Sequence, residues 1–492
     1  MIDLRFAVPA AAGWLAAIAV LPFPAWMLPL AVACWAAAGG ALVTARLTGR
    51  ELLVVLGVSA AAMALVVTAA AAGSAARRPA ALRHSPVLVS ATVVTTQTVT
   101  PASTHFTATL VRSGDRAFSV PVVVFDAAPR ERVEIGTALT VSGTLQATSP
   151  SDEDSYLVFA RHPGRVVAPP PWYLSWANGL RAGLSRECAS LPGLGAQLLP
   201  GLAIGDTTGV SASLNLAMKT SALSHLTAVS GANCAVVIGL ILLAGRALGL
   251  RRGVRIAAAL VVLIGFVVLV TPQPSVLRSA IMAAVMLGAL SMGRPLAGLP
   301  VVAVTVLALL TLDPWLAFDY GFALSVLATA GLMAFAGPIA RRLAQWLPRW
   351  IAVLIAVPLA AQLACQPVLL SLNPSLPLWG VLANTLAEPA SPIATVIGLL
   401  ACMTVPLAPG VGHAIALIAW APATWIADVA VYFAALPGAR VPWPGGWVGI
   451  AALVAATVLV LVLLLGSVGA RVRVILAGAL VLVIVVPIAV GS

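Results

Sequence analysis

The stretch SHLTAVSGANCAVVIGLILL, residues 224–243, decides the fold of this chain. Its second half is an unbroken apolar run, and runs close to the roughly 20 residues that span a bilayer recur along most of the sequence. Of the 492 residues, 61% are hydrophobic and only 9% are charged, whereas a soluble globular protein carries about 25% charged residues. The sequence therefore predicts a polytopic α-helical membrane protein with about 11–13 spans.

The apolar runs also predict where the individual spans lie. Three open the chain, and a polar region separates them from the rest, which resume near residue 222. The predicted spans are 6–22, 25–45 and 51–72, followed by 222–245, 254–270, 275–291, 297–311, 320–337, 351–371, 378–403, 412–435, 447–466 and 474–490.

The distribution of arginine predicts the orientation of these spans. The net charge is +12, and Lys219 is the single lysine. Alternating the spans puts almost all loop arginines on one side, which the positive-inside rule identifies as cytoplasmic. We therefore expect a multi-pass protein of the cytoplasmic (inner) membrane, with the polar region on the extracytoplasmic side. The arginines concerned are Arg5, Arg46, Arg50, Arg246, Arg251, Arg252, Arg255, Arg294, Arg341, Arg342, Arg349, Arg471 and Arg473.

The polar region, residues 84–168, alternates as β-strands do. In ALTVSGTLQ, the residues Leu139, Val141, Gly143 and Leu145 fall on one face of a strand. Four similar runs lie at 87–95, 104–111, 118–125 and 156–160, with turn residues between them. Five short strands in about 80 residues suit a small barrel of the OB type, and a plain five-stranded sheet is the alternative.

The residues that follow, 171–192, predict an amphipathic helix. Trp172, Trp176, Leu180 and Leu184 share one face, whereas Arg181 and Arg186 lie away from it. This pattern is typical of a helix that lies in the membrane interface rather than crossing the bilayer.

Polar residues inside the predicted spans are candidates for a functional site, because such residues are costly in lipid. One span, 376–404, is interrupted by Pro389 and by two further prolines, which predicts a broken or a merely kinked helix. Arg278 pairing with Asp313 or Asp319 at the outer face, and interhelical hydrogen bonds from the amides, are the structural alternatives. The candidates are His225, Ser230, Gly231, Asn233, Arg278, Asp313, Asp319, Gln362 and Asn384.

Enzymatic chemistry has little support in the sequence. His225 and Ser230 point about 140° apart on a continuous helix, so a hydrolase built on them needs a break at Gly231. Walker motifs, dinucleotide-binding glycine patterns and zinc-type clusters of His and Cys are missing. We expect no catalytic residue, no bound metal and no cofactor.

Ordered motifs resemble those of the ComEC-type competence proteins, the inner-membrane channels for DNA uptake. GLAIGDTTGVSASLNLAMKTSALSHLTAVSGANCAVVIG contains the family's Gly-Asp, at Gly205 and Asp206, and its His-Leu-x-Ala-Val-Ser-Gly, at residues 225–231. Further similar motifs follow in the family's order. They are PSVLRSAIMA at 274–283, LDPWLAFDYGFALSVLATAGL at 312–332, AAQLACQP at 360–367 and LWGVLANTLAEPASP at 378–392.

The resemblance implies an architecture and a function. The domains expected are N-terminal transmembrane helices (1–75), an external OB-like domain (84–168), an amphipathic interfacial helix (171–192) and a competence-type channel domain (196–492). The function implied is translocation of single-stranded DNA across the cytoplasmic membrane during natural transformation. The partners implied are a DNA receptor and a cytoplasmic ATPase or single-strand-binding proteins.

Two points qualify this implication. Many family members end in a metallo-β-lactamase-like domain, whose zinc motif this chain does not contain, so we expect a separate nuclease to degrade the other strand. Residues 84–166 carry six basic and seven acidic residues, unlike a strong binder of single strands. A transporter of another polyanion or of a small solute remains the alternative function, and a membrane-embedded hydrolase is a third.

Overall fold

The computed structural model describes residues 6–82, 87–101, 103–129, 131–227, 231–270, 274–291 and 298–465. The chain forms two compact units. The first contains the residues up to 183 together with 237–319, and the second contains 184–236 together with the residues from 320 onward. Each unit therefore combines segments that are far apart in the sequence, and the predicted channel domain 196–492 contributes to both.

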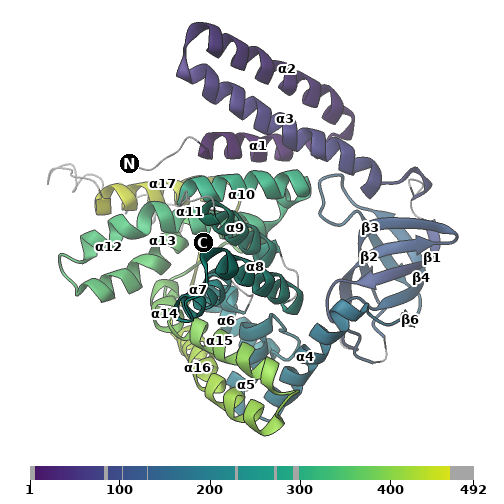
Figure 1. Cartoon of the computed structure of the whole chain (residues 1–492), viewed down its shortest axis with the longest axis vertical. Helices are drawn as coiled ribbons and strands as arrows, with labels where there is room; N and C mark the ends of the chain where they lie inside the picture. Colours follow the sequence, from purple (N-terminus) through teal and green to yellow (C-terminus); the bar gives the residue numbers. More distant parts are fainter. Residues whose placement is uncertain are drawn as a thin grey trace. The chain divides into compact units, whose positions relative to one another are not determined.

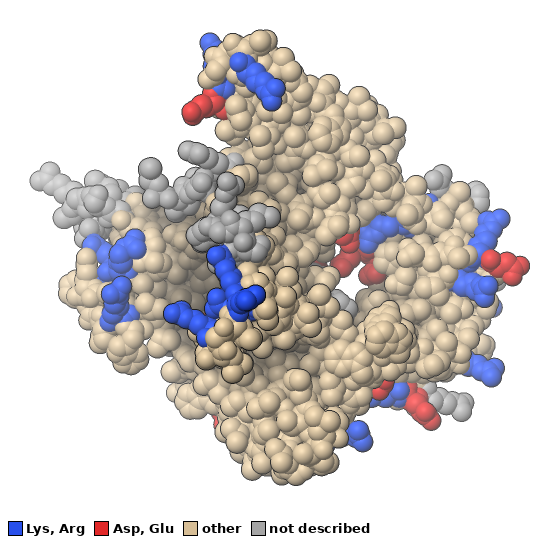
Figure 2. Space-filling model, viewed as in Figure 1, with Lys and Arg blue, Asp and Glu red and all other residues tan. Residues whose placement is uncertain are grey.

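The helices are those of a multi-pass membrane protein. Among the described residues, seven helices are long and apolar enough to cross a bilayer, and a bent pair makes up an eighth. Five shorter apolar helices accompany them, and the predicted span 474–490 lies outside the described residues. Large apolar side chains such as Leu47, Leu312 and Trp447 are 76–87% exposed, and uncharged residues dominate the helical surface in Figure 2. Such a surface requires lipid around it.

The first unit begins with a hairpin of two long helices. The helices α2 and α3 pack along each other, and α1 lies against α3 (Figure 1). A Cβ atom on Gly57 would come within 2.7 Å of Leu42, so small residues allow this close approach. The helices of the first unit are α1 (Ala7–Val20), α2 (Pro24–Thr48), α3 (Glu51–Arg77), η1 (Ala80–Leu82), most of α4 (Trp172–Ala189) and α7 (Gly231–Ala247), α8 (Arg252–Leu269), α9 (Pro274–Ser291), α10 (Leu299–Leu312) and η3 (Pro314–Phe318).

A closed β-barrel follows α3 in the first unit. Its strands are β1 (Val87–Thr95), β2 (His105–Ser113), β3 (Arg116–Phe125), β4 (Ala138–Ala147) and β5 (Tyr156–Ala160). Pairing runs β1-β2-β3-β5-β4 and returns from β4 to β1, with β3 and β5 parallel. The prediction of an OB-like barrel is therefore confirmed, and closure rules out the plain sheet. A sixth strand, β6 (Arg165–Ala168), which the sequence pattern did not predict, pairs with β4.

The faces of β4 lie as the alternation predicts. Leu139, Val141 and Leu145 are at most 1% exposed and belong to the barrel core. Gly143 fills the fourth inward position because a Cβ there would collide with the carbonyl oxygen of Phe159 on β5. The glycine therefore lets β4 and β5 pair closely where the barrel closes.

The helix predicted at 171–192 is present as α4, but the pattern did not predict that one of its arginines is buried. Arg181, which the sequence places away from the apolar face of the helix, is only 4% exposed. Its guanidinium donates to the carbonyl oxygens of Val268 and Leu269, at 2.6 and 2.7 Å, and to Asn178 Oδ1. Arg181 thus satisfies carbonyl groups at the C-terminal end of α8, where a cation is favourable.

The second unit is built around the buried helix α5. Thr395 Oγ1 donates to the Leu202 carbonyl at 2.9 Å, and Gly195 lies against Thr424, so α15 and α16 both pack on α5. The elements of this unit are α5 (Gly193–Ile204), α6 (Ala212–Thr220), η2 (Ser224–Leu226), α11 (Tyr320–Gly331), a π-helical turn η4 (Leu332–Ala336), α12 (Gly337–Leu343), α13 (Arg349–Leu372), β7 (Ser375–Pro377), α14 (Gly380–Ala387), α15 (Ala390–Thr404), α16 (Pro409–Ala435), β8 (Arg440–Pro442) and α17 (Gly446–Leu465).

Candidate functional site at a broken helix

The interrupted span at 376–404 is a broken helix. It contains α14 and α15, which meet at Glu388 and Pro389 with a bend of 44°. Proline lacks the backbone N–H that would continue the helical ladder. The prediction of a broken rather than a merely kinked helix is confirmed.

An extended segment precedes the break. The strand β7 pairs with β8, so backbone that is not helical satisfies part of its own hydrogen bonding. Two glutamines of α13 extend toward it. Gln362 Nε2 and Gln366 Nε2 each lie 3.5 Å from a β7 carbonyl oxygen, those of Pro377 and Ser375. Protein groups thus take the place of water around non-helical backbone in an apolar setting.

Arg440 connects three segments of the second unit. From β8, it donates to Ser375 Oγ on β7 at 2.9 Å and to the carbonyl oxygen of Lys219 at the end of α6. Burial lowers the pKa of Arg440 from its usual value. The segment after α6 is thereby held beside the paired strands.

The segment after α6 packs directly on the broken helix. Ala222 adopts a left-handed backbone conformation, φ 61°, which is strained for a residue with a Cβ. Asn384 Nδ2 on α14 donates to the carbonyl of Gly380 at 2.7 Å and lies 3.4 Å from that of Ala222. A Cβ on Gly380 would lie 3.0 Å from Gln362 Oε1 and 3.3 Å from Ala222 Cβ. Gln362 and Asn384 therefore belong to one site.

Two side-chain oxygens of this site lack a hydrogen-bond partner among the described residues. Asn384 is 6% exposed, and its Oδ1 accepts no hydrogen bond from the described part of the chain. Gln366 Oε1 is in the same situation. Buried acceptors normally find a partner in protein or in ordered water. The two oxygens are therefore free to accept a hydrogen bond from water or from another polar group.

His225 lies at the break itself. It belongs to the single turn η2, and its Nε2 is 3.8 Å from Glu388 Oε1, the residue between α14 and α15. The side chains are 52% and 31% exposed. A partly exposed, ionisable pair thus lies where the helix is interrupted.

The family motif Gly205–Asp206 has a structural role. Gly205 ends α5 in the left-handed conformation, φ 74°, as glycine commonly does at a helix C-terminus. Asp206 is 8% exposed and accepts from Ser185 Oγ at 3.0 Å and from Thr208 N and Oγ1 at 3.0 and 2.6 Å. These bonds fix the turn that leads toward α6 and η2.

Four predicted site residues cannot be placed in this geometry. Ser230 lies outside the described residues. Gly231 begins α7, and Asn233 lies on the same helix, with Arg278 on α9, but their side chains lie outside what the structure describes. Their assignment to a pathway stays a prediction.

Asp313 and Asp319 belong to a different cluster, in the first unit. Asp313 caps η3 by accepting from Trp315 N at 3.1 Å, and its Oδ1 lies 3.5 Å from Arg77 Nη1. The Arg77 guanidinium covers the Trp315 ring at 4.1 Å and donates to the Glu153 carbonyl at 2.8 Å. Asp313 therefore pairs with Arg77, a partner that the sequence analysis did not consider.

This cluster anchors the loop between β4 and β5. Trp315 Nε1 donates to the Pro150 carbonyl at 2.9 Å, and Arg78 donates to those of Thr148 and Ser149 at 2.7 and 2.6 Å. The barrel loop is thus held on η3 and on the end of α3. Burial raises the pKa of Glu153 to about 7, and the charges of Asp319, Asp154 and Asp313 add to this effect, while Arg77 opposes it.

The raised pKa predicts a pH-dependent stability. The folded protein holds a proton on Glu153 up to about pH 7, whereas the unfolded chain releases it near pH 4.5. Stability therefore decreases as pH rises between these values. We expect Glu153→Gln to raise the thermal unfolding midpoint at pH 8 and to leave it unchanged at pH 4.5, measured on purified protein in detergent. An equal effect at both pH values would contradict this assignment.

Sequence reasoning missed several residues of the site at the broken helix. Arg440 and Gln366 were not selected as candidates. Ala222 could not be selected from the sequence, because nothing in the sequence indicates that this alanine adopts a left-handed backbone conformation. Glu388 was not among the candidates either, because its proximity to His225 depends on tertiary structure. Among the described residues, no group of three or more His, Cys, Asp or Glu side chains could hold a metal ion.

Comparison with known proteins supports the resemblance to competence proteins that the sequence motifs indicate. The family model described as "Competence protein" matches residues 202–468, which is more than half of the chain and includes His225, Gln362, Asn384 and Glu388. No curated protein and no solved structure matched the chain. The chain is a multi-pass membrane protein that belongs to the competence protein family, whose role is in DNA uptake.

Proposed function

We propose that this protein is the channel through which one strand of DNA crosses the cytoplasmic membrane during natural transformation. The observation that carries the proposal is the broken helix α14–α15, with the non-helical turn around Ala222 packed on it and His225 exposed beside Glu388. Non-helical backbone at membrane depth is tolerated where it is buried in protein or lines a water-filled path. A strand with one charge per nucleotide requires such a path.

The proposal assigns roles to individual groups. The Oδ1 atom of Asn384 and the Oε1 atom of Gln366, buried acceptors without a partner in the described structure, would receive hydrogen bonds from water or from the N–H groups of passing bases. His225, exposed and next to Glu388, would contact the phosphate backbone. Ser230, Gly231, Asn233 and Arg278 would complete the polar lining. Nothing in these roles requires a covalent step, and we propose no enzymatic activity.

The proposal includes the orientation and the partners. The arginine asymmetry supports placing the barrel on the extracytoplasmic side of the inner membrane. There a DNA receptor would deliver the substrate. A cytoplasmic ATPase or single-strand-binding proteins would draw the strand inward, and a separate nuclease would degrade the other strand.

Uptake of labelled DNA tests the function. We expect cells that lack the gene to hold dye-labelled DNA outside and to show no nuclease-protected label in the cytoplasm, and the restored gene to return it. A transformable strain serves as the positive control. Unchanged uptake without the gene would refute the channel.

A proton-coupled transporter of another polyanion or a small solute is the second candidate. The pairing of His225 with Glu388 favours it, because a histidine that faces a carboxylate can carry a proton. Transport by such a carrier would stop when the pH gradient is collapsed at constant membrane potential, and DNA uptake would not depend on the gene.

A further inference from the structure

Three aromatic rings form a continuous row on the outer face of the barrel. His105 on β2 pairs in register with Phe125 on β3, and Phe125 pairs with Phe159 on β5. The ring centroids of His105 and Phe125 are 5.6 Å apart, and those of Phe125 and Phe159 are 5.2 Å apart with an angle of 17° between planes. We call His105, Phe125 and Phe159 the aromatic row.

The barrel fold does not require this row. The neighbours Phe106, Val124 and Val158 point inward and are not exposed, and they already fill the core. Phe159 is 40% exposed, His105 is exposed and Phe125 is half-buried. An exposed stack of rings on a polar, strand-rich surface is the form of a platform on which further flat rings can stack.

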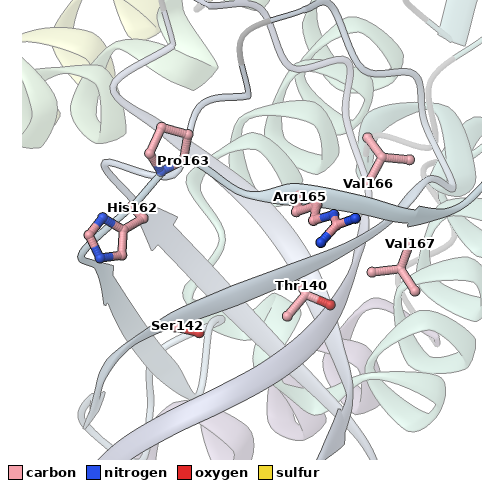
Figure 3. A pocket seen from close by; sticks show the side chains of 7 residues that line it. All are labelled: Thr140, Ser142, His162, Pro163, Arg165, Val166 and Val167. Carbon is pink, nitrogen blue, oxygen red and sulfur yellow. The ribbon is translucent and has the colours of Figure 1, made fainter.

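A polar pocket continues the same face beyond Phe159. Phe159 lies opposite Thr144 on β4, and Ser142, two residues earlier, accepts a backbone bond from Arg161. Here a pocket of about 520 Å³ lies over β4, β6 and the turn that precedes β6 (Figure 3). It is lined by Thr140, Ser142, His162, Pro163, Arg165, Val166 and Val167.

The chemistry of the pocket selects an anion. Its four polar side chains, Thr140, Ser142, His162 and Arg165, can all donate hydrogen bonds, and no carboxylate lines it. Ser142 and Thr140 lie two and four residues along β4 from Thr144, the residue opposite Phe159, which at about 3.3 Å per residue places the pocket roughly 7–13 Å from the aromatic row. A ligand that fits both has a flat ring joined to a phosphate.

We propose that the aromatic row and this pocket together bind unpaired nucleic acid, with a base stacked on the row and its phosphate in the pocket at Arg165 and His162. An unpaired base presents a free ring face, whereas a duplex hides its faces in the helical stack. The proposal deepens the proposed function and rests on it for the biological ligand. It assigns the barrel the task of holding the strand that the channel receives.

The loop between β4 and β5 does not take part. It is the loop that Arg78 and Trp315 hold, and it precedes the start of β5, whereas the pocket follows the end of β5. The binding face therefore stays accessible while the barrel is anchored.

Binding by the full-length protein in detergent tests the proposal. The probes are a fluorescein-labelled oligothymidylate of about 12 nucleotides and a duplex of equal length, followed by anisotropy. We expect the single strand to bind more tightly than the duplex, and Phe159→Leu to weaken single-strand binding about tenfold. Phe159→Tyr retains the ring and is expected to retain affinity.

Two arginines provide a matched pair for the pocket. Arg165→Gln is expected to weaken binding and to reduce the slope of log affinity against log salt by about 0.7, the value for one phosphate contact on a single strand. Arg116→Gln removes an equally exposed arginine at the other end of β3 and is expected to change neither. Thermal unfolding midpoints identify any variant that fails to fold.

The results separate this proposal from the proposed function. If Phe159→Leu and Arg165→Gln fold and bind the single strand as the parent protein does, the proposed site is refuted, even where deletion of the gene abolishes uptake. If both variants lose binding while deletion leaves uptake intact, the site stands and the channel assignment fails. Equal affinity for the single strand and the duplex would also refute the proposal that an unpaired base stacks on the aromatic row.

Discussion

Arg181→Leu is expected to destabilise the protein by about 3 kcal/mol or more, because it leaves several buried acceptors unpaired. The guanidinium donates to the carbonyls of Val268 and Leu269 and to Asn178 Oδ1. Asn178 Nδ2 in turn donates to the carbonyl of Ile135 in the barrel at 2.9 Å. The change therefore weakens both the end of α8 and the attachment of α4 to the barrel.

The measurement is the thermal unfolding midpoint of the purified protein in detergent. Arg181→Lys keeps the charge but cannot reproduce the three bonds, so its midpoint is expected to fall between those of Arg181→Leu and the parent. Arg186→Leu, at an exposed position on the same helix, is the control and is expected to shift the midpoint little. A shift for Arg181→Leu no larger than that for Arg186→Leu would contradict the structural role.

The second large effect is expected from blocking the break in the helix. His225→Cys places a thiol where the native side chain is 52% exposed, beside the junction of α14 and α15. Attachment of a bulky, charged, membrane-impermeant reagent there should obstruct the path. We expect DNA uptake to fall by about 100-fold relative to the same His225→Cys cells without reagent, equivalent to a barrier about 2.7 kcal/mol higher.

His413→Cys is the matched control for this block. His413 on α16 also faces a carboxylate, that of Glu187, and its side chain is 50% exposed, but it does not lie at the break. Its modification is expected to leave uptake unchanged. The parent chain, in which none of the five cysteines forms a disulfide and three are buried, shows the background. Equal loss at both positions would point to general damage rather than to a path at His225.

The sequence was sufficient to predict features that depend on local pattern. The alternation of β4 identified its inward residues, and Pro389 identified the break between α14 and α15. Five short alternating strands predicted a small barrel with a plain sheet as the alternative, and the pairing of β1 with β4 shows that the barrel is closed. These features arise from backbone sterics and from the two-residue period of a strand, which a single segment already contains.

Features that depend on residues far apart in the sequence could not be predicted in this way. Arg181 lies on the polar side of an amphipathic pattern, and its burial comes from α8 docking on α4. Asp313 pairs with Arg77, which lies far from it in the sequence. His225 and Glu388 are separated by 163 residues, so only tertiary structure brings them to 3.8 Å. Such contacts can be recognised only once the tertiary structure is known.

Direct contact between DNA in transit and the broken helix is the most direct test of the channel. A photo-reactive benzoylphenylalanine in place of His225, illuminated while the cells take up labelled DNA, should become cross-linked to a single strand. The same group in place of His413 should not. Label on the protein at position 225, resistant to a duplex-specific nuclease, is the expected result. Continued uptake with no cross-link at position 225, or equal cross-linking at both positions, would contradict it.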